Sequence, residues 1–197
     1  MKIYDISQEV LTSVVFPGDP APKREVLASL DKGDICNLSH LSMCAHNGTH
    51  IDASYHFIEG GKTVDAISLD RVVGYCYVAA FEGILSANDA RSLLRCARVR
   101  SPEAAKRILI KGKATVSLEA AEVFAEAGIL LIGNESQTVG PEEAPIAVHR
   151  VLLSKEVVLL EGIRLAEVPT GVYFLSAAPL NFAGTDGSPC RALLLDL

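Results

Sequence analysis

Residues 45–57 read A-H-N-G-T-H-I-D-A-S-Y-H-F, and this stretch carries the strongest signal in the chain. Three of the five histidines, His46, His50 and His56, lie in it together with Asp52. Imidazole and carboxylate groups are the side chains that hold borderline transition metals such as zinc and manganese. The stretch therefore predicts a metal site, around which the rest of the chain should be organised.

The conformation of this stretch follows from its turn residues. His46 and His50 have the spacing of two ligands on one helix face, but Asn47-Gly48 between them is a turn signal. A fully extended chain would separate the two histidines by roughly 13 Å, too far for them to share one ion. We therefore expect a bend at Asn47-Gly48, after which His50 and Asp52 point to one side of a strand. His56 could be a further ligand or a nearby proton carrier.

The composition is that of an ordinary globular protein. The chain has 197 residues, of which 49% are hydrophobic and 21% charged, and the net charge is −6 with histidine neutral. We take residues 1–197 as a single domain, because this length suits one large core. The negative charge argues against a nucleic acid or an anionic membrane as a partner. No stretch approaches the ~20 apolar residues of a membrane span, and the N-terminus lacks a signal-peptide pattern, so a cytoplasmic protein is expected.

The cysteines do not suggest a structural framework. They are scattered, odd in number and without C-x-x-C spacing: Cys36, Cys44, Cys76, Cys96 and Cys190. We expect reduced thiols that are mostly buried. Cys44 lies two residues before His46 and could approach the site, although the role of a small apolar filler on a strand is favoured.

Apolar runs between turn signals predict more strands than helices, with no repeat and no linker. We expect strands at residues 2–10, 35–45, 72–81, 108–111, 129–133, 157–160, 172–177 and 190–195. We expect helices from a cap at Asn88 to residue 96, briefly after Ser101, and at residues 118–127 and 146–154. The helix at 118–127 is the clearest, since Ser117 can cap its start and Gly128 can end it.

Four residues outside the opening stretch are further candidates. His149 lies on a predicted helix and Glu161 ends a predicted strand, and for each residue alone an ordinary structural role is favoured. An unpaired buried Glu161 would be costly, so it is either exposed or compensated by a cation. Phe16, in the loop F-P-G-D-P, could be a core plug or a wall of a substrate pocket. His40 is expected to be hydrogen-bonded or exposed rather than a ligand.

Taken together, these motifs resemble the cyclase family of metal-dependent hydrolases, which includes bacterial kynurenine formamidases and isatin hydrolase. Residues 46–56 match the family pattern H-x-G-T-H-x-D-x-P-x-H, except that Ser54 replaces the proline. The likeness continues in F-P-G-D at residues 16–19, in H-R-x-L-L from His149, in Glu161-Gly162 and in G-x-D-G-S-P-x-R at residues 184–191.

The resemblance implies a metal site with two ions. It implies that His46, His50 and Asp52 bind a first ion. It also implies that Asp52 reaches a second ion, that His149 binds this second ion and that Glu161 bridges both. The expected cofactor is a pair of zinc ions, with manganese as an alternative.

The resemblance also implies a fold, an assembly and a role for His56. The fold class is α/β (α+β), with a β-rich three-layer β/β/α core of the cyclase/kynurenine formamidase type. The assembly is a homodimer or a higher homo-oligomer, in which a loop of one subunit helps to close the pocket of the other. His56 is implied as the general acid/base.

Three departures from the family pattern concern the surroundings of the site. Ser54 lacks the fixed φ angle of the family proline, which affects the orientation of the His56 side chain. Phe16 stands where kynurenine formamidases have tryptophan, so the substrate could differ. The loop at residues 133–140 reads G-N-E-S-Q-T-V-G instead of G-x-D-x-x-S-x-D, so Glu135 and Gly140 replace two aspartates.

The expected function is hydrolysis of a small amide, formamide or lactam, as in an arylformamidase. Divalent ions lower the pKa of bound water and polarise the substrate carbonyl. His56 would take the water's proton and return it to the leaving nitrogen, work that suits a pKa near 6.5. The alternative is a metal-binding protein without hydrolase activity, which retains the site for structure or sensing. The altered loop and Ser54 support this alternative, but an open site with a spare histidine favours catalysis.

Overall fold

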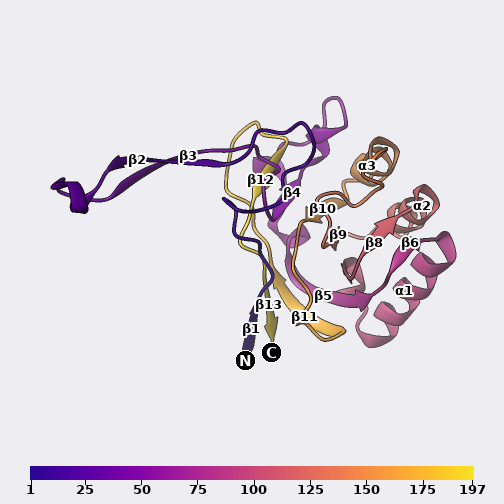
Figure 1. The fold of residues 1–197 in the computed structure, drawn as a ribbon. Coiled ribbons are helices and arrows are strands. Elements are labelled where there is room, and N and C mark those ends of the chain that lie inside the picture. The colour runs from indigo at the N-terminus through magenta and orange to yellow at the C-terminus, as the bar shows by residue number, and fades with distance from the viewer.

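One nine-stranded mixed sheet forms the frame of the computed structural model, which describes residues 1–197. Across the sheet the strands are β1 (Lys2–Asp5), β13 (Leu193–Asp196), β11 (Gly171–Ser176), β5 (Val73–Ala80), β7 (Arg107–Lys111), β9 (Leu131–Asn134), β10 (Val158–Glu161), β4 (His50–Asp52) and β12 (Gly187–Pro189). The pairs β5–β7, β7–β9 and β9–β10 are parallel, and the other pairs are antiparallel. Because β1 pairs with β13, the two chain ends lie side by side (Figure 1).

Three helices gather on one side of this sheet (Figure 1). They are α1 (Ala87–Arg100), α2 (Leu118–Glu126) and α3 (Ile146–Ser154). The Ser117 side chain caps α2 as expected. The expected cap of α1 at Asn88 is wrong, because Ser86 caps this helix in a reciprocal capping box with Asp89. Helix α1 also runs on to Arg100 instead of ending at Cys96.

The central strands are buried on both faces, and their side chains alternate between two apolar clusters. In β5, Tyr77 and Ala79 pack with the helices, whereas Cys76 and Val78 point into the other cluster. This second cluster also holds Leu194 of β13, although β13 lies far from β4 and β10 in the strand order. The sheet therefore curls around it. The expected α+β class with a β-rich β/β/α core is confirmed.

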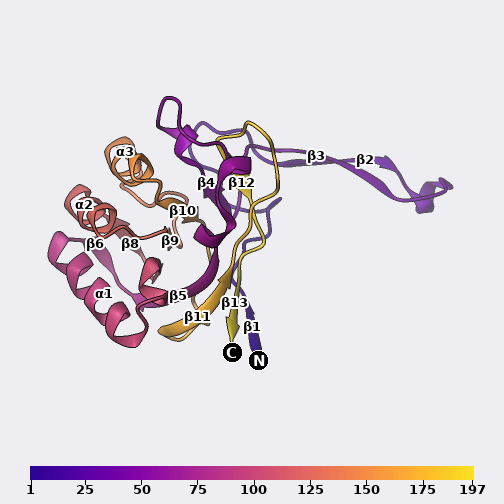
Figure 2. The same ribbon diagram turned by 180° about the vertical axis from the view of Figure 1, so that it is seen from behind.

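Two small sheets and five short 3-10 turns complete the fold. Strands β2 (Lys23–Ala28) and β3 (Leu38–Ser42) pair as an antiparallel ribbon, and β6 (Gly83–Leu85) pairs in parallel with β8 (Ala114–Val116). The 3-10 turns are Leu30–Lys32, Ser54–His56, Val64–Ala66, Leu69–Arg71 and Ala104–Lys106. The β2–β3 ribbon projects far from the body of the molecule, as both ribbon views show (Figure 2).

Most expected elements are present, with shifts at their ends. Helix 146–154 matches α3 at both ends, and the other predicted strands and helices overlap an observed element. The strand expected at residues 2–10 ends at Asp5, and the helix expected after Ser101 is only a 3-10 turn. Strands β2, β6, β8 and β12 were not predicted. These strands are short, or exposed along most of their length, so they lack the alternation of a half-buried strand.

The longest helix, α1, has 14 residues, and none of the helices combines the length and the apolar character needed to cross a membrane.

The five cysteines are free thiols, as expected, but they are not mostly buried. Cys36 lies exposed at the tip of the β2–β3 ribbon and Cys96 lies on the solvent side of α1, so only Cys76 is fully buried. Burial raises the pKa of the Cys76 and Cys190 thiols to about 12, which makes them unreactive. The Cys44 sulfur lies 3.8 Å from an Asp19 carboxylate oxygen.

Candidate metal centre

The expected bend at Asn47-Gly48 is confirmed, and it folds His46 back over the strand that follows. Gly48 adopts the left-handed backbone conformation with φ of +70°, and the Asn47 side chain accepts a hydrogen bond from the Cys44 amide at 2.8 Å. After the bend, β4 holds Asp52. The result is a distance of 2.9 Å between His46 Nδ1 and Asp52 Oδ1.

Sheet pairing brings Glu161 to the same place. Strand β4 lies between β10 and β12, and Glu161 of β10 is paired directly with His50. Paired residues project to one face of a sheet, and Asp52, two residues after His50, shares that face. His50 Nε2 consequently lies 3.4 Å from both Asp52 Oδ1 and Glu161 Oε2. All three side chains are almost fully buried.

His149 completes the group from α3, which connects β9 to β10. Its Nε2 lies 3.3 Å from Glu161 Oε1 and 3.7 Å from Asp52 Oδ2. Backbone carbonyls fix the other ring nitrogens: His149 Nδ1 donates to the Pro145 carbonyl at 2.9 Å, and His50 Nδ1 donates to the Gly48 carbonyl at 3.0 Å. The Nε2 atoms of both rings are thus directed at the carboxylates, as in metal-binding histidines.

These residues form two groups that share Asp52. The first is His46, His50 and Asp52 and the second is Asp52, His149 and Glu161, and in each group the ligand atoms lie within 4.8 Å of one another. Ligand atoms that are each ~2.0–2.2 Å from a tetrahedral zinc ion lie roughly 3.3 Å apart, close to the separations seen here.

One atom of this centre lacks a partner. Asp52 Oδ2 is buried and has no hydrogen-bond partner, which would be costly for an ionised carboxylate without a cation beside it. The two ligand groups that share Asp52, and the unpaired Oδ2 atom of Asp52, both fit a pair of divalent ions.

Without metal, protonated histidines balance the buried carboxylates. Burial lowers the pKa of His46, but the charge of Asp52 and hydrogen bonds to Asp186 and Asp52 outweigh it and raise the pKa to about 11. For His50, burial is likewise outweighed by Asp52 and Glu161, and the pKa rises to about 9. Burial opposes ionisation of Asp52 and Glu161, yet the neighbouring histidines hold the pKa of both carboxyls below the usual values. The centre is therefore built for positive charge.

His56 lies outside these two groups, but with His46 and Asp186 it forms a third cluster whose ligand-type atoms lie within 4.8 Å of one another. It belongs to the 3-10 turn Ser54–His56, and its ring centroid lies 4.1 Å from that of His46 and 4.3 Å from that of Phe57. Burial, together with the positive charge of His46 and His149, lowers its pKa despite the nearby carboxylates. His56 is therefore neutral at neutral pH, the form that can accept a proton.

Ser54, which replaces the family proline, is fixed by hydrogen bonds instead of by a ring. Its Oγ accepts a hydrogen bond from the Lys62 amide at 2.8 Å, and the Tyr55 amide donates to the Lys62 carbonyl at 2.9 Å. Gly61 packs against the Ser54 backbone so closely that an added Cβ would lie 2.6 Å from its carbonyl carbon. The turn that carries His56 is therefore held in place without proline.

A cavity of about 190 Å³ opens onto this centre. Its lining residues are Phe16, Asp19, His46, His50, His56, Phe57, Gln137, Thr138, Pro145, His149 and Glu161. Phe16 thus lies on the wall of the cavity and not in the core. His40 is far from this centre, exposed on the β2–β3 ribbon with its Nδ1 3.6 Å from Glu25 Oε2, as expected for a residue that is not a ligand.

The two departures in the loop at residues 133–140 have structural roles. The Glu135 carboxylate accepts hydrogen bonds from the Gly112 and Leu165 amides at 2.6 and 2.8 Å, so it ties three loops together away from the cavity. Gly140 packs against α3, where an added Cβ would lie 3.0 Å from Val148 Cβ. Neither residue lines the cavity.

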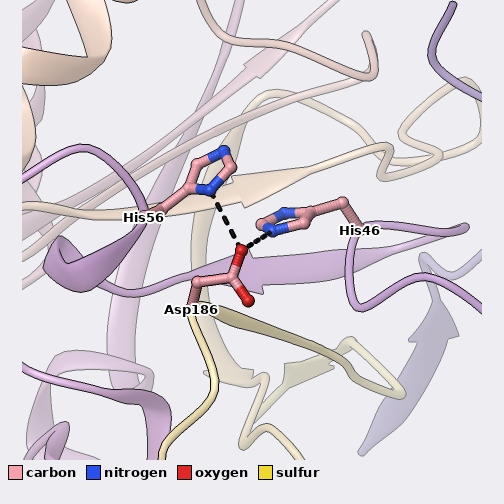
Figure 3. Close-up of side chains that lie close together, drawn as sticks. All are labelled: His46, His56 and Asp186. Atoms are coloured by element: carbon pink, nitrogen blue, oxygen red, sulfur yellow. Dashed lines mark hydrogen bonds and ion pairs between the residues drawn. The ribbon is translucent and has the colours of Figure 1, made fainter. Parts of the chain in front are cut away.

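Sequence reasoning missed Asp186. Its Oδ2 accepts hydrogen bonds from His46 Nε2 at 2.9 Å and from His56 Nδ1 at 3.2 Å (Figure 3). The hydrogen bond from His46 is the largest of the effects that hold the pKa of Asp186 far below its usual value, although burial opposes them. The signal was present, since Asp186 lies in the motif G-T-D-G-S-P of residues 184–189.

Comparison with known proteins gives consistent matches over the chain. A family model described as a putative cyclase matches residues 4–141. A kynurenine formamidase of Erythrobacter litoralis (strain HTCC2594) is 30% identical over an alignment of 210 residues. The alignment covers 100% of this chain and 94% of that relative.

Solved structures show the same fold. A potential metal-dependent hydrolase with cyclase activity is 29% identical with a TM-score of 0.82, and the match covers 98% of this chain and 96% of that one. Isatin hydrolase A from Labrenzia aggregata is 20% identical with a TM-score of 0.81, over 98% of this chain and 93% of that one, which is a likeness of fold alone.

Proposed function

Since the chain belongs to the putative cyclase family, we propose that it is a metal-dependent hydrolase that cleaves the C–N bond of a small amide, formamide or lactam. One observation carries the proposal: two three-residue ligand groups share Asp52, and a further histidine, His56, lies beside them in a cavity. A structural zinc site is closed by four protein ligands, whereas a catalytic site keeps a position open. The arrangement therefore favours catalysis over a purely structural or sensing role.

The ligands in this proposal are those expected from the family pattern. His46, His50 and Asp52 would hold one ion, Asp52 and His149 would hold a second, and Glu161 would bridge both. The ions are zinc, with manganese as the alternative, because imidazole and carboxylate donors suit both. When bound, divalent ions lower the pKa of water and polarise a carbonyl oxygen.

His56 moves the proton in this reaction. Its Nδ1 is engaged by Asp186, so its Nε2 is the nitrogen that can accept a proton from water. The same nitrogen then returns the proton to the leaving nitrogen of the substrate. Phe57 packs against the His56 ring and limits its rotation. The half-buried side chain of His56 lines the cavity, where part of the solvent is excluded.

The cavity wall limits the substrate to a small molecule. Phe16 contributes an apolar face to the wall, and Gln137 and Thr138 contribute polar groups. A volume of about 190 Å³ suits a compact amide better than a peptide. A hydrolysis screen with zinc- or manganese-loaded protein should include N-formyl anilides, cyclic imides, lactams and lactones. Activity on N-formyl anilides would place the substrate among the formamides, and activity only on cyclic substrates would place it among the lactams or imides.

The decisive variant is His56→Ala. We expect it to lose turnover while it binds as much metal as the unmodified protein, because His56 lies outside both ligand groups. Arg95→Ala is the control, since Arg95 is exposed on α1 and does not line the cavity, and it should keep full activity. Loss of metal from His56→Ala would make His56 a ligand and overturn its role. Binding of metal by the unmodified protein without hydrolysis of any of these substrates would favour the non-catalytic alternative.

The β2–β3 ribbon supports a homodimer. An isolated two-stranded ribbon is marginal in water, yet this one exposes Leu27, Ile35 and Leu38 to solvent. A groove of about 430 Å³ is lined by Leu41 of the ribbon and by Leu11 and Leu180 of the body. In the proposed dimer a second copy covers the ribbon and this groove, while its own ribbon is covered in return. The proposal takes residues 1–197 as one domain per subunit, because the first and last strands pair.

Sedimentation analysis tests this assembly. Ile35→Glu places a charge at the ribbon tip, where the side chain is 99% exposed in the single subunit, and it should shift the protein towards monomer. Ile84→Glu, on the exposed strand β6, is the matched control and should leave the assembly unchanged. A monomeric unmodified protein, or an Ile35→Glu dimer of unchanged strength, would contradict the proposed contact.

A further inference from the structure

The Asp186 carboxylate joins the two histidines that the proposed reaction uses differently, one as a metal ligand and one as a proton carrier (Figure 3). We propose that Asp186 is a positioning residue that fixes the tautomer and orientation of both His46 and His56. The inference rests on the proposed function for its catalytic meaning, but its structural content can be tested without any substrate.

The hydrogen bonds determine which nitrogen of each ring remains free. Asp186 Oδ2 accepts from His46 Nε2, so His46 Nδ1 is left to face Asp52 Oδ1 at 2.9 Å. The same oxygen accepts from His56 Nδ1, so the lone pair of His56 is on Nε2. A carboxylate on the far side of a histidine ring is the usual way to orient a metal ligand or a general base. Here one carboxylate oxygen does both.

The backbone around Asp186 is anchored from three directions. The Ala53 amide donates to the Asp186 carbonyl at 2.9 Å, and the Val64 amide donates to the Thr185 carbonyl at 2.9 Å. The Gly184 amide donates to Asp65 Oδ1 at 3.0 Å. These hydrogen bonds hold the turn next to the end of β4, and they keep the Asp186 carboxylate within hydrogen-bond distance of both histidine rings.

The next residue makes room for the His46 ring. Gly187 is paired with Asp52 across β12 and β4, and an added Cβ would lie 2.5 Å from His46 Cε1. The ring of His46 thus lies directly against the backbone at Gly187, with Asp186 on one nitrogen and Asp52 on the other. Asp186 and Gly187 together fix the position of the His46 ring, one through a hydrogen bond and the other by leaving space for it. This packing supports a positioning role for Asp186 independently of the hydrogen bonds.

Asp186 differs from the carboxylates of the two ligand groups. Its side chain is 41% exposed, whereas those of Asp52 and Glu161 are 1% and 3% exposed. Asp186 also contacts Nε2 of the His46 ring, whereas Asp52 contacts Nδ1. These positions indicate a residue that acts through the histidines and not a bridge between the metal ions.

The test compares Asp186→Ala and Asp186→Asn with Asp65→Asn. Asp65 anchors the same turn without touching a histidine, so Asp65→Asn removes a nearby charge but retains an oxygen acceptor for Gly184. The first readout is ¹⁵N NMR of the histidine side chains in zinc-loaded protein without substrate. We expect His56 protonated on Nδ1 in the unmodified protein and in Asp65→Asn, and a mixture of tautomers in Asp186→Ala.

The second readout is zinc affinity, measured by competition with a chromophoric chelator. Loss of an outer carboxylate partner of a metal-binding histidine typically weakens metal binding 10–100-fold, and we expect a fall of about this size for the first ion in Asp186→Ala. With saturating zinc, kcat should fall ~10–100-fold while KM changes by less than ~3-fold, because His56 is misdirected but the cavity wall is intact. Asp186→Asn keeps one acceptor oxygen, so its zinc affinity and its kcat should lie between those of the unmodified protein and those of Asp186→Ala.

Unchanged tautomers and unchanged zinc affinity in Asp186→Ala would overturn the inference. A third zinc ion, bound by the unmodified protein and lost in Asp186→Ala, would also overturn it, since Asp186 would then be a ligand with His46 and His56. If the unmodified protein hydrolyses nothing, the proposed function fails, whereas the NMR and zinc measurements still decide the role of Asp186.

Discussion

His50 and Glu161 are a directly opposed pair on neighbouring antiparallel strands, with His50 Nε2 3.4 Å from Glu161 Oε2. The sheet itself therefore sets the distance between these two side chains of the candidate metal centre, because the pairing of β4 with β10 fixes them on one face. A centre built on paired strands is rigid, and loss of one partner leaves the other uncompensated in the protein interior.

Glu161→Gln should lower the bound metal from two ions to at most one per chain, because the second group keeps only Asp52 and His149. The metal-free variant should also lose about 1–3 kcal/mol of unfolding free energy, since buried protonated histidines lose a partner. Elemental analysis and urea denaturation measure the two effects. Glu143→Gln, on the exposed loop before α3, should behave like the unmodified protein. Two ions retained in Glu161→Gln would show that Glu161 is not a ligand.

Metal uptake at neutral pH should release protons. His46 and His50 have pKa values raised to about 11 and about 9 in the metal-free centre, so both are protonated at pH 7. A metal ion binds neutral imidazole, and hence about two protons should leave when the first group is loaded. Titration calorimetry in buffers of different ionisation enthalpy gives this number. Release should decline as the pH rises through about 9, and uptake without proton release would contradict the charge state described here.

Metal-free protein should lose stability on the alkaline side. The folded pKa of His50 is raised to about 9 from 6.5, so its contribution is complete below pH 6.5 and disappears as the pH rises through about 9. The pKa values of Asp52 and Glu161 are lowered, so their contribution is present above their usual values of 3.8 and 4.5 and is lost on acidification. Urea midpoints in chelator should therefore be highest from about pH 5 to 6.5. Zinc-loaded protein should show no such alkaline decline, because metal then replaces the protons.

Ser54→Ala should reduce kcat several-fold with no change in bound metal, because Oγ no longer holds the Lys62 amide and the turn that carries His56 loosens. Ser54→Pro should stay within ~3-fold of the unmodified protein. The preceding residue, Ala53, has φ −89° and ψ 159°, which a following proline accepts, and proline would restrain the turn instead. Steady-state kinetics at saturating metal distinguish the two variants. Equal losses in both would mean that the Ser54 hydroxyl contributes directly to the reaction.

The local part of the centre could be predicted from the sequence, because the bend at Asn47-Gly48 and the spacing of His50 and Asp52 are short-range properties. The bounds of helix α3 could be predicted for the same reason, because the apolar pattern of residues 146–154 is also a short-range property. The contacts of Asp186 could not be predicted, since they join residues far apart in the chain and depend on the pairing of β12 with β4. Of the β2–β3 ribbon, β3 lies within the strand expected at residues 35–45, but β2 and its pairing with β3 escaped prediction. Strand β2 is exposed along almost its whole length, so it lacks the alternation by which a half-buried strand is recognised.

Gly187→Ala should displace His46 and weaken metal binding by the first group. An alanine Cβ would lie 2.5 Å from His46 Cε1, and the ring cannot move aside without breaking its hydrogen bonds to Asp52 or Asp186. We expect zinc affinity for the first ion to fall about 10–100-fold, the size of effect seen when a metal-binding histidine loses its orientation. Gly171→Ala is the matched control, because its added Cβ would make only an ordinary contact of 3.6 Å with Tyr173. Circular dichroism verifies that both variants fold, and chelator competition measures zinc. Equal zinc affinity in the two variants would mean that the His46 ring does not need the space at Gly187 to bind metal.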